Sequence, residues 1–255
     1  MRGRSPFLVF CISLTTTFAS TIAKPLQSSR PTGKISPAQI FEKHFAAVGG
    51  ADSKNPVQSL AVTGTFHIPP THPLGDFHFY YRAPESDLFQ LDAISHGQSS
   101  IGHSAGARFF KHTGEKVGGI NGVTLEVLED DWLGLIEKEY KGLYSAIELV
   151  GLSEVDKKWA YAIRFTPKTG DPKVRYYDCD SSLIVRTDSV QRVRLEKNGR
   201  EIAYKVESYY SGYRDSYGVR LPHEIRVNAS GGDFVLDVQA VHVNTPLKDS
   251  LFASE

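Results

Sequence analysis

Three histidines lie close together in the sequence and are the first residues to consider for chemistry. His96, His103 and His112 fall within seventeen positions, and on neighbouring strands their imidazoles could converge on a metal ion. The common zinc sites use a His-Glu-x-x-His pattern or paired cysteines, and the sequence has neither. We therefore interpret these histidines as surface residues and assign no metal and no cofactor.

Patterns for nucleophilic and acid–base catalysis are also missing. No Gly-x-Ser-x-Gly elbow of a serine hydrolase occurs. His223 and Glu224 are neighbours on an expected strand, so their side chains should point to opposite faces. The acidic triplet at 129–131 is interpreted as a solvated helix face rather than a calcium site, and the two aspartates that flank Cys179 disfavour its thiolate. We assign no catalytic residue.

The charge balance argues against a nucleic-acid partner. Lys+Arg and Asp+Glu are both 29 among 255 residues, so the net charge is zero, whereas nucleic-acid binders carry an excess of basic residues. Apolar residues make up 40% and charged residues 23%, as in ordinary globular proteins. We expect a protein that is soluble, monomeric and free of nucleic acid.

The first residues predict export. Two arginines precede an apolar stretch at 6–18, and small residues follow up to Ala23, which is the pattern of a secretory signal peptide cleaved near Ala23. Residues 1–23 are therefore the signal peptide, 24–35 a polar linker and 36–255 a single domain. The mature protein would be periplasmic or secreted. Cys179 would be its one cysteine, so its stability must come from the core rather than a disulfide.

Two or three helices are expected. Ser36 can cap a helix over 37–48, Pro37 suits its first turn, and Gln39 completes a capping box. Apolar residues recur along one side, and Gly49-Gly50 ends the helix. Residues 124–147 also read as helical, with an apolar side that includes Leu128 and Trp132, although glycines within the segment weaken it.

Most of the remaining chain alternates with the period of β-strands. Strands are expected at about 60–68, 76–82, 88–94, 107–112, 159–166, 173–179, 183–194, 202–213, 219–228 and 233–243, with a turn at 215–218. Many strands with few helices predict an α+β protein, in which a curled antiparallel sheet is covered by helices on one side. Alternation places the following apolar residues on the inner face: Val62, Phe66, Ile68, Phe77, Phe79, Tyr81, Tyr204, Val206, Tyr210, Phe234, Leu236 and Val238.

Several segments, taken in order, resemble the LolA-like outer-membrane lipoprotein carriers and lipoprotein-sorting proteins. They are IFEKHFAAVGG at 40–50, SLAVTGTFHIP at 59–69, FHFYYRAPES at 77–86, YSAIELVGLSEVDKKWAYAIRFTPKTGDP at 144–172, YYDCDSSLIVRTDS at 176–189 and ESYYSGYRDSYGVRLPHEIRV at 207–227. The resemblance implies a strongly curved antiparallel sheet forming an incomplete β-barrel, with helices across the open side and an apolar cavity beneath them. One element departs from the family, because Phe109-Phe110 stands where relatives tend to carry a tryptophan.

The resemblance implies a non-catalytic carrier of a lipophilic ligand, such as a lipid or a lipoprotein acyl chain, with a membrane-associated donor or acceptor. The twelve inner-face residues would then bind the ligand. Two other readings stay open: an enzyme that acts on an apolar small molecule in the same cavity, and an interaction module whose core is filled. Alternation shows which side faces inward but not whether the interior is hollow.

Overall fold

The structure, a computed structural model, describes residues 31–49, 57–69, 72–84, 86–94, 97–104, 107–113, 128–129, 132, 144–194, 200–229 and 232–253. The predicted signal peptide at 1–23 and most of the linker at 24–35 lie outside these residues. Within the described part of the chain, no helix is long and apolar enough to cross a membrane.

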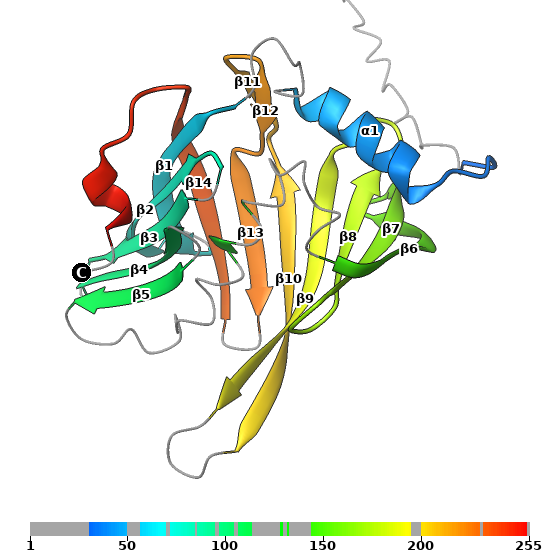
Figure 1. The fold of residues 1–255 in the computed structure, drawn as a ribbon. Helices are drawn as coiled ribbons and strands as arrows, with labels where there is room; N and C mark the ends of the chain where they lie inside the picture. The colour runs from blue at the N-terminus through cyan, green and yellow to red at the C-terminus, as the bar shows by residue number, and fades with distance from the viewer. Residues whose placement is uncertain are drawn as a thin grey trace, which may run out of the picture.

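One large antiparallel sheet dominates the fold (Figure 1). Its twelve strands run in the order β5-β4-β3-β2-β1-β14-β13-β10-β9-β8-β7-β6. β5 and β6 form the two edges and do not pair with each other, so the barrel is not closed. The strands are β1 (Ser59–Ile68), β2 (His72–Arg82), β3 (Ser86–Ala93), β4 (Gly97–Ser104), β5 (Ala107–Thr113), β6 (Tyr144–Val155), β7 (Lys158–Pro167), β8 (Lys173–Asp178), β9 (Ile184–Arg194), β10 (Glu201–Ser211), β13 (Glu224–Ala229) and β14 (Gly232–Val243).

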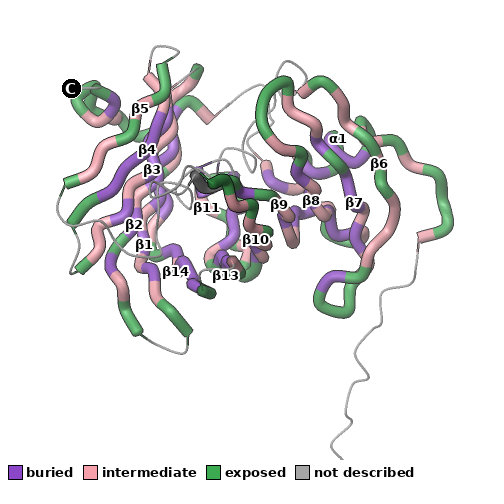
Figure 2. The backbone as a smooth tube through the Cα atoms, turned by 90° about the horizontal axis from the view of Figure 1, so that it is seen from below, coloured by how far each residue is buried: buried purple, intermediate pink, exposed green. Residues whose placement is uncertain are grey.

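The sheet is bent into a trough. Viewed from below, β1–β5 stand on one side and β6–β9 on the other, with β14, β13 and β10 between them (Figure 2). Gly64 lies at a β-bulge between β1 and β14. A Cβ atom there would lie 2.0 Å from the carbonyl oxygen of Asp237 and 2.6 Å from the Phe77 ring. Only glycine therefore lets the bulge form beneath the Phe77 ring.

The predicted fold class is confirmed, as are most of the predicted strands. Strands β4 and β6 were not expected. The end of the predicted helix at 124–147 is wrong, because Tyr144–Ile147 belong to β6. Register shifts at Tyr144/Ala146 and Leu149/Gly151 interrupt the alternation of β6, which explains why its period was not recognised. Leu128, Glu129 and Trp132 have helical backbone, and the remainder of 124–143 lies outside the described residues.

The stretch at 209–227 contains the expected turn. β11 (Arg214–Ser216) and β12 (Val219–Leu221) form a small hairpin. The backbone N–H of Gly218 donates to Asp215 Oδ1 over 3.1 Å, and Gly218 has a φ of 82°, which glycine adopts without steric cost. A short 3-10 helix, η2 (Asp249–Phe252), follows the last strand of the sheet.

α1 (Pro37–Val48) lies over the β6–β9 side of the trough (Figure 1). Its buried face contains Ile40, Phe41, His44 and Val48. The Phe41 ring packs against Phe165 and Tyr177 with centroids 5.6 and 5.8 Å apart. The face of the sheet that α1 covers is therefore the inner one, and we call it the concave face.

The capping box of α1 is present as predicted. Gln39 N–H donates to the Ser36 hydroxyl over 3.3 Å, and Ser36 N–H donates to Gln39 Oε1 over 2.9 Å. Ser36→Ala should lower the free energy of unfolding by about 1 kcal/mol, because the N–H of Gln39 loses its acceptor, the Ser36 hydroxyl. Urea denaturation would measure this loss. Ser36→Asp, which keeps an acceptor, should retain most of the stability, and an equal loss in both variants would contradict the capping role.

Candidate functional site

The structure brings most of the twelve predicted inner-face residues together on the concave face. Directly paired residues of antiparallel strands share a face, so the strand register shows which side chains are neighbours. One row runs from Tyr210 through Ile225 and Leu236 to Phe66. Another joins Val62 to Phe79 and Phe89. These rows belong to a single buried cluster, in which Phe77, Val206, Phe234 and Val238 also lie.

Three of the twelve predicted inner-face residues are less buried than the others. Tyr81 is partly buried against the cluster, and Tyr204 is half-buried opposite Gln191. Ile68 is 44% exposed at the end of β1, where it pairs with His72 beside the β1–β2 turn. The alternating pattern of the sequence extends beyond the buried part of β1. Ile68, at the end of this strand, therefore lies outside the apolar cluster.

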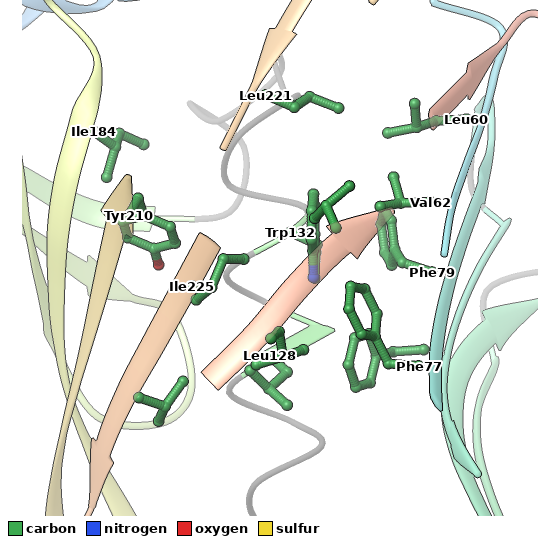
Figure 3. Packing of buried hydrophobic residues seen from close by; sticks show 14 of the residues in the cluster. Leu60, Val62, Phe77, Phe79, Leu128, Trp132, Ile184, Tyr210, Leu221 and Ile225 are labelled. Atoms are coloured by element: carbon green, nitrogen blue, oxygen red, sulfur yellow. The ribbon is translucent and has the colours of Figure 1, made fainter. Parts of the chain in front are cut away.

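Two residues outside the sheet lie in the middle of this apolar surface. Leu128 and Trp132 are both 0% exposed. The Trp132 ring stacks on Phe79 and Phe77 with centroids 5.5 and 6.3 Å apart. Figure 3 shows Leu128 and Trp132 between the side of the trough that carries Phe77 and Phe79 and the side that carries Tyr210 and Ile225. The chain itself therefore occupies the apolar surface at this point.

A hollow of about 600 Å³ lies elsewhere, at the ends of strands β1–β5. Thr65, Gly75, Asp92 and Ile94 are among the residues that line it, and none of the twelve predicted residues does so. It is therefore separate from the apolar surface under Trp132.

The concave face changes character toward β8–β10. A row of paired residues runs from Ile163 through Arg175 and Thr187 to Ser208, and Arg175, Thr187 and Ser208 are all buried. Lys173 is buried too, and its ammonium lies 5.5 Å from the centre of the Tyr144 ring. The Tyr210 hydroxyl donates to Thr187 Oγ1 over 3.0 Å. One half of the concave face is thus apolar, and the other half carries polar and cationic groups.

A histidine of α1 is buried beside this polar half. His44 lies against Tyr177, with ring centroids 5.2 Å apart, and its Nδ1 lies 3.0 Å from the carbonyl oxygen of Ser182. A carbonyl oxygen only accepts, so Nδ1 carries the proton and the ring is the neutral Nδ1–H tautomer. Burial, assisted by the charge of Arg175, lowers the pKa of His44 to about 4 although the Ser182 carbonyl opposes the shift.

A cluster of charged side chains joins Glu129 to the outer strands. The His103 Nδ1–H donates to Asp87 Oδ1 over 3.1 Å, and Arg108 Nη2 donates to Glu129 Oε2 over 2.8 Å. The same Nδ1 lies 3.4 Å from Glu129 Oε1. Glu129 is only 2% exposed, so the prediction of a solvated acidic face is wrong at this residue. Its negative charge is tolerated in the interior because Arg108 and His103 pair with it.

The groups in this cluster titrate far from their usual ranges. Burial, together with the nearby Glu129 carboxylate, raises the pKa of Asp87 to about 6. Hydrogen bonds to Asp87 and Glu129 raise the pKa of His103 to about 10. Burial tends to raise the pKa of Glu129, but His103, Asp87 and Arg108 outweigh it and the pKa is lowered. At neutral pH the cluster therefore contains an ionised Glu129 and a cationic His103.

Two of the three histidines considered in the sequence are described by the structure, and they have different partners. His103 pairs with the carboxylates, whereas His112 is bound to the Ser99 hydroxyl at 2.7 Å; His96 lies outside the described residues. Burial and the charges of the flanking aspartates raise the pKa of the Cys179 thiol to about 11. Its thiolate is therefore disfavoured, as predicted.

The fold and the concave face define a class of protein: an open antiparallel half-barrel whose inner face is covered by a helix and by Leu128 and Trp132. A LolA superfamily protein from Nitrosomonas europaea has this fold. The two structures align with a TM-score of 0.53 over 87% of this chain and 99% of that chain, at 14% sequence identity. The structural resemblance to LolA-like proteins is thus confirmed at the level of the fold.

Two further solved structures align less well. A DUF1329 family protein from Desulfovibrio piger gives a TM-score of 0.47 at 15% identity, covering 84% of this chain and 97% of that chain. An outer membrane lipoprotein-sorting protein domain from Vibrio parahaemolyticus gives 0.46 at 12% identity, covering 84% and 94%. No family model matches the sequence, and no curated protein matches it either.

Proposed function

We propose that this is an exported, non-catalytic protein that binds or carries a lipophilic ligand on the concave face of its half-barrel. One observation carries the proposal: a continuous apolar surface on β1, β2, β13 and β14 is covered by Leu128 and Trp132, which come from outside the sheet. A segment that packs on such a surface can be exchanged for a ligand of similar polarity. The fold it shares with a LolA superfamily protein supports the same proposal by analogy.

The energies of exchange allow such a displacement. Burying one long acyl chain contributes roughly 10 kcal/mol relative to water, at about 0.8 kcal/mol for each methylene. Removing a buried tryptophan from its contacts costs about 3–5 kcal/mol. An acyl chain can therefore replace Trp132 with a net gain. A bilayer offers the chain almost the same gain, so exchange with a membrane-associated donor or acceptor would be reversible.

The two halves of the concave face favour an amphiphile over a pure hydrocarbon. The acyl part would lie on the apolar half, around Phe66 and Phe79. The head group would then lie toward the polar half, where Lys173, Arg175 and Thr187 are buried on the same face. A lipid or an acylated lipoprotein has both parts.

Quenching by brominated fatty acids tests this assignment. The chain has two tryptophans: Trp132 on the concave face and the half-buried Trp159 on β7. Trp159→Phe leaves Trp132 as the reporter, and Trp132→Phe leaves Trp159. We expect dibromostearate to quench Trp132 strongly and Trp159 weakly, with saturation, because bromine quenches at short range.

The opposite result would support a different function. Equal or absent quenching of the two tryptophans, together with no lipid in native mass spectra of protein purified from its own host, would contradict the carrier proposal. The close packing of Trp132 on Phe77 and Phe79 would then indicate an interaction module with a permanently filled core.

A further inference from the structure

The charged cluster at Asp87, His103 and Glu129 has the composition of a metal site. Asp87 is on β3 and His103 is paired with it on β4, while Glu129 follows Leu128, which is buried in the apolar cluster. One potential ligand atom from each of these three residues lies within 4.8 Å of the other two. Carboxylate oxygens and an imidazole nitrogen are the ligands that first-row divalent metals take in proteins.

The buried oxygens of the cluster are incompletely satisfied. Asp87 and Glu129 are only 5% and 2% exposed. Asp87 Oδ2 and Glu129 Oε1 are both buried without a hydrogen-bond partner. Arg108 donates to the other oxygen of Glu129, Oε2. Oxygens without a hydrogen-bond partner on two buried carboxylates are costly. The cationic His103 lies near both carboxylates but leaves these two oxygens without a hydrogen bond, and a metal ion could ligate them.

We propose that Asp87, His103 and Glu129 bind a zinc ion. The His103 Nδ1 lies 3.1 Å from Asp87 Oδ1 and 3.4 Å from Glu129 Oε1. The ligand atoms of a tetrahedral zinc ion with bonds of about 2.0–2.1 Å are separated by about 3.3–3.4 Å. The ion would replace the proton that His103 now donates, and water would take the fourth position on the solvent side of the half-exposed His103. Mixed nitrogen and oxygen ligands favour zinc over calcium or magnesium.

The role of the ion follows from the position of Glu129. This residue adjoins the buried Leu128 and lies three positions before Trp132 in the sequence, whereas Asp87 and His103 belong to the sheet. Zinc at this site would tie Glu129, next to Leu128, to β3 and β4. Arg108, bonded to the outer oxygen of Glu129, would orient that carboxylate toward the ion. The site is structural and does not depend on the proposed lipid binding.

Zinc titration of chelator-treated protein tests the proposal. We expect one zinc ion per chain and a rise in melting temperature of about 5–10 °C at a zinc concentration 100-fold above Kd. Asp87→Asn and Glu129→Gln should each weaken zinc binding by at least about tenfold. His78 and Asp92 form a matched control, because this histidine–carboxylate pair lies 3.2 Å apart on the neighbouring strands β2 and β3. Asp92→Asn should leave zinc binding unchanged.

Cobalt gives a measurement that does not depend on how the variants fold. Co²⁺ bound to the wild-type protein should show the visible absorption of a tetrahedral site, and zinc should abolish it by competition. Failure to bind zinc at one equivalent, stabilisation by calcium but not by zinc, or equal zinc affinity in wild type, Asp87→Asn and Glu129→Gln would each overturn the proposal. In those cases a protonated His103, together with Arg108, would balance the two carboxylates.

Discussion

Trp132→Ala is expected to lower the free energy of unfolding by about 3–5 kcal/mol and to raise the affinity for a fluorescent fatty acid by about tenfold or more. The loss of stability follows from the complete burial of Trp132 and its stacking on Phe77 and Phe79. The gain in affinity follows from the proposed function, because ligand and indole compete for the same surface. Removing the indole removes much of the work of displacing it.

Chemical denaturation and a probe titration on the same preparations would measure both effects. Trp159→Ala is the matched control, since Trp159 is the other tryptophan of the chain and is only half-buried on β7. It should cost less stability and leave probe affinity unchanged. If Trp132→Ala were destabilised but bound the probe with unchanged or lower affinity, Trp132 would only stabilise the hydrophobic core and would not compete with a ligand. Saturating probe should also restore part of the lost stability, because a ligand stabilises the state that binds it.

The alternation of the sequence predicted much of the concave face. Val62, Phe66 and Phe79 were assigned to one side of their strands from period alone, and the register places Val62 beside Phe79 and Phe66 beside Leu236. The prediction succeeds because a strand with one buried face must keep its apolar residues two apart. It fails at Ile68, because period does not show where the core ends along a strand.

The alternation of apolar residues could not identify the polar residues that face the interior. In β8, Lys173 and Arg175 alternate with Val174 and Tyr176, so the usual rule would turn the two cations outward. The structure buries both cations, and the Arg175 guanidinium lies 5.0 Å from the centre of the Phe165 ring. The two-residue period of a strand shows which side chains share a face. Which of the two faces is buried depends on the elements that pack against the sheet.

Glu129 shows a second limit of the sequence. Its place in an acidic triplet suggested solvent, and only the three-dimensional structure brings Arg108 and His103 to it from β5 and β4. The partners lie 21 and 26 positions away in the sequence, and no local pattern records the pairing. Whether the interior is hollow was open for the same reason: Leu128 and Trp132 were identified as an apolar helix side, but their target surface depends on the fold.

Acidification should destabilise the protein through His44. The pKa of His44 is about 4 in the folded protein, mainly because the ring is buried, and its ordinary value is 6.5. Between these values the unfolded chain binds a proton that the folded protein does not, so stability falls as the pH is lowered from 6.5 to 4. Each pKa unit corresponds to about 1.4 kcal/mol, so the loss is about 3 kcal/mol at pH 4 relative to pH 7.

A His44→Gln variant isolates this contribution, because glutamine can still donate to the Ser182 carbonyl but does not titrate. Denaturation curves at pH 7 and pH 4 should show a loss about 3 kcal/mol smaller in His44→Gln than in the wild-type protein. His242→Gln, at an exposed position on β14, should keep the wild-type pH dependence, so that the comparison cancels the carboxylates that titrate in the same range. If His44→Gln lost as much stability on acidification as the wild type, His44 would have to be protonated in the folded protein, and its burial against Tyr177 would have to accommodate the charge.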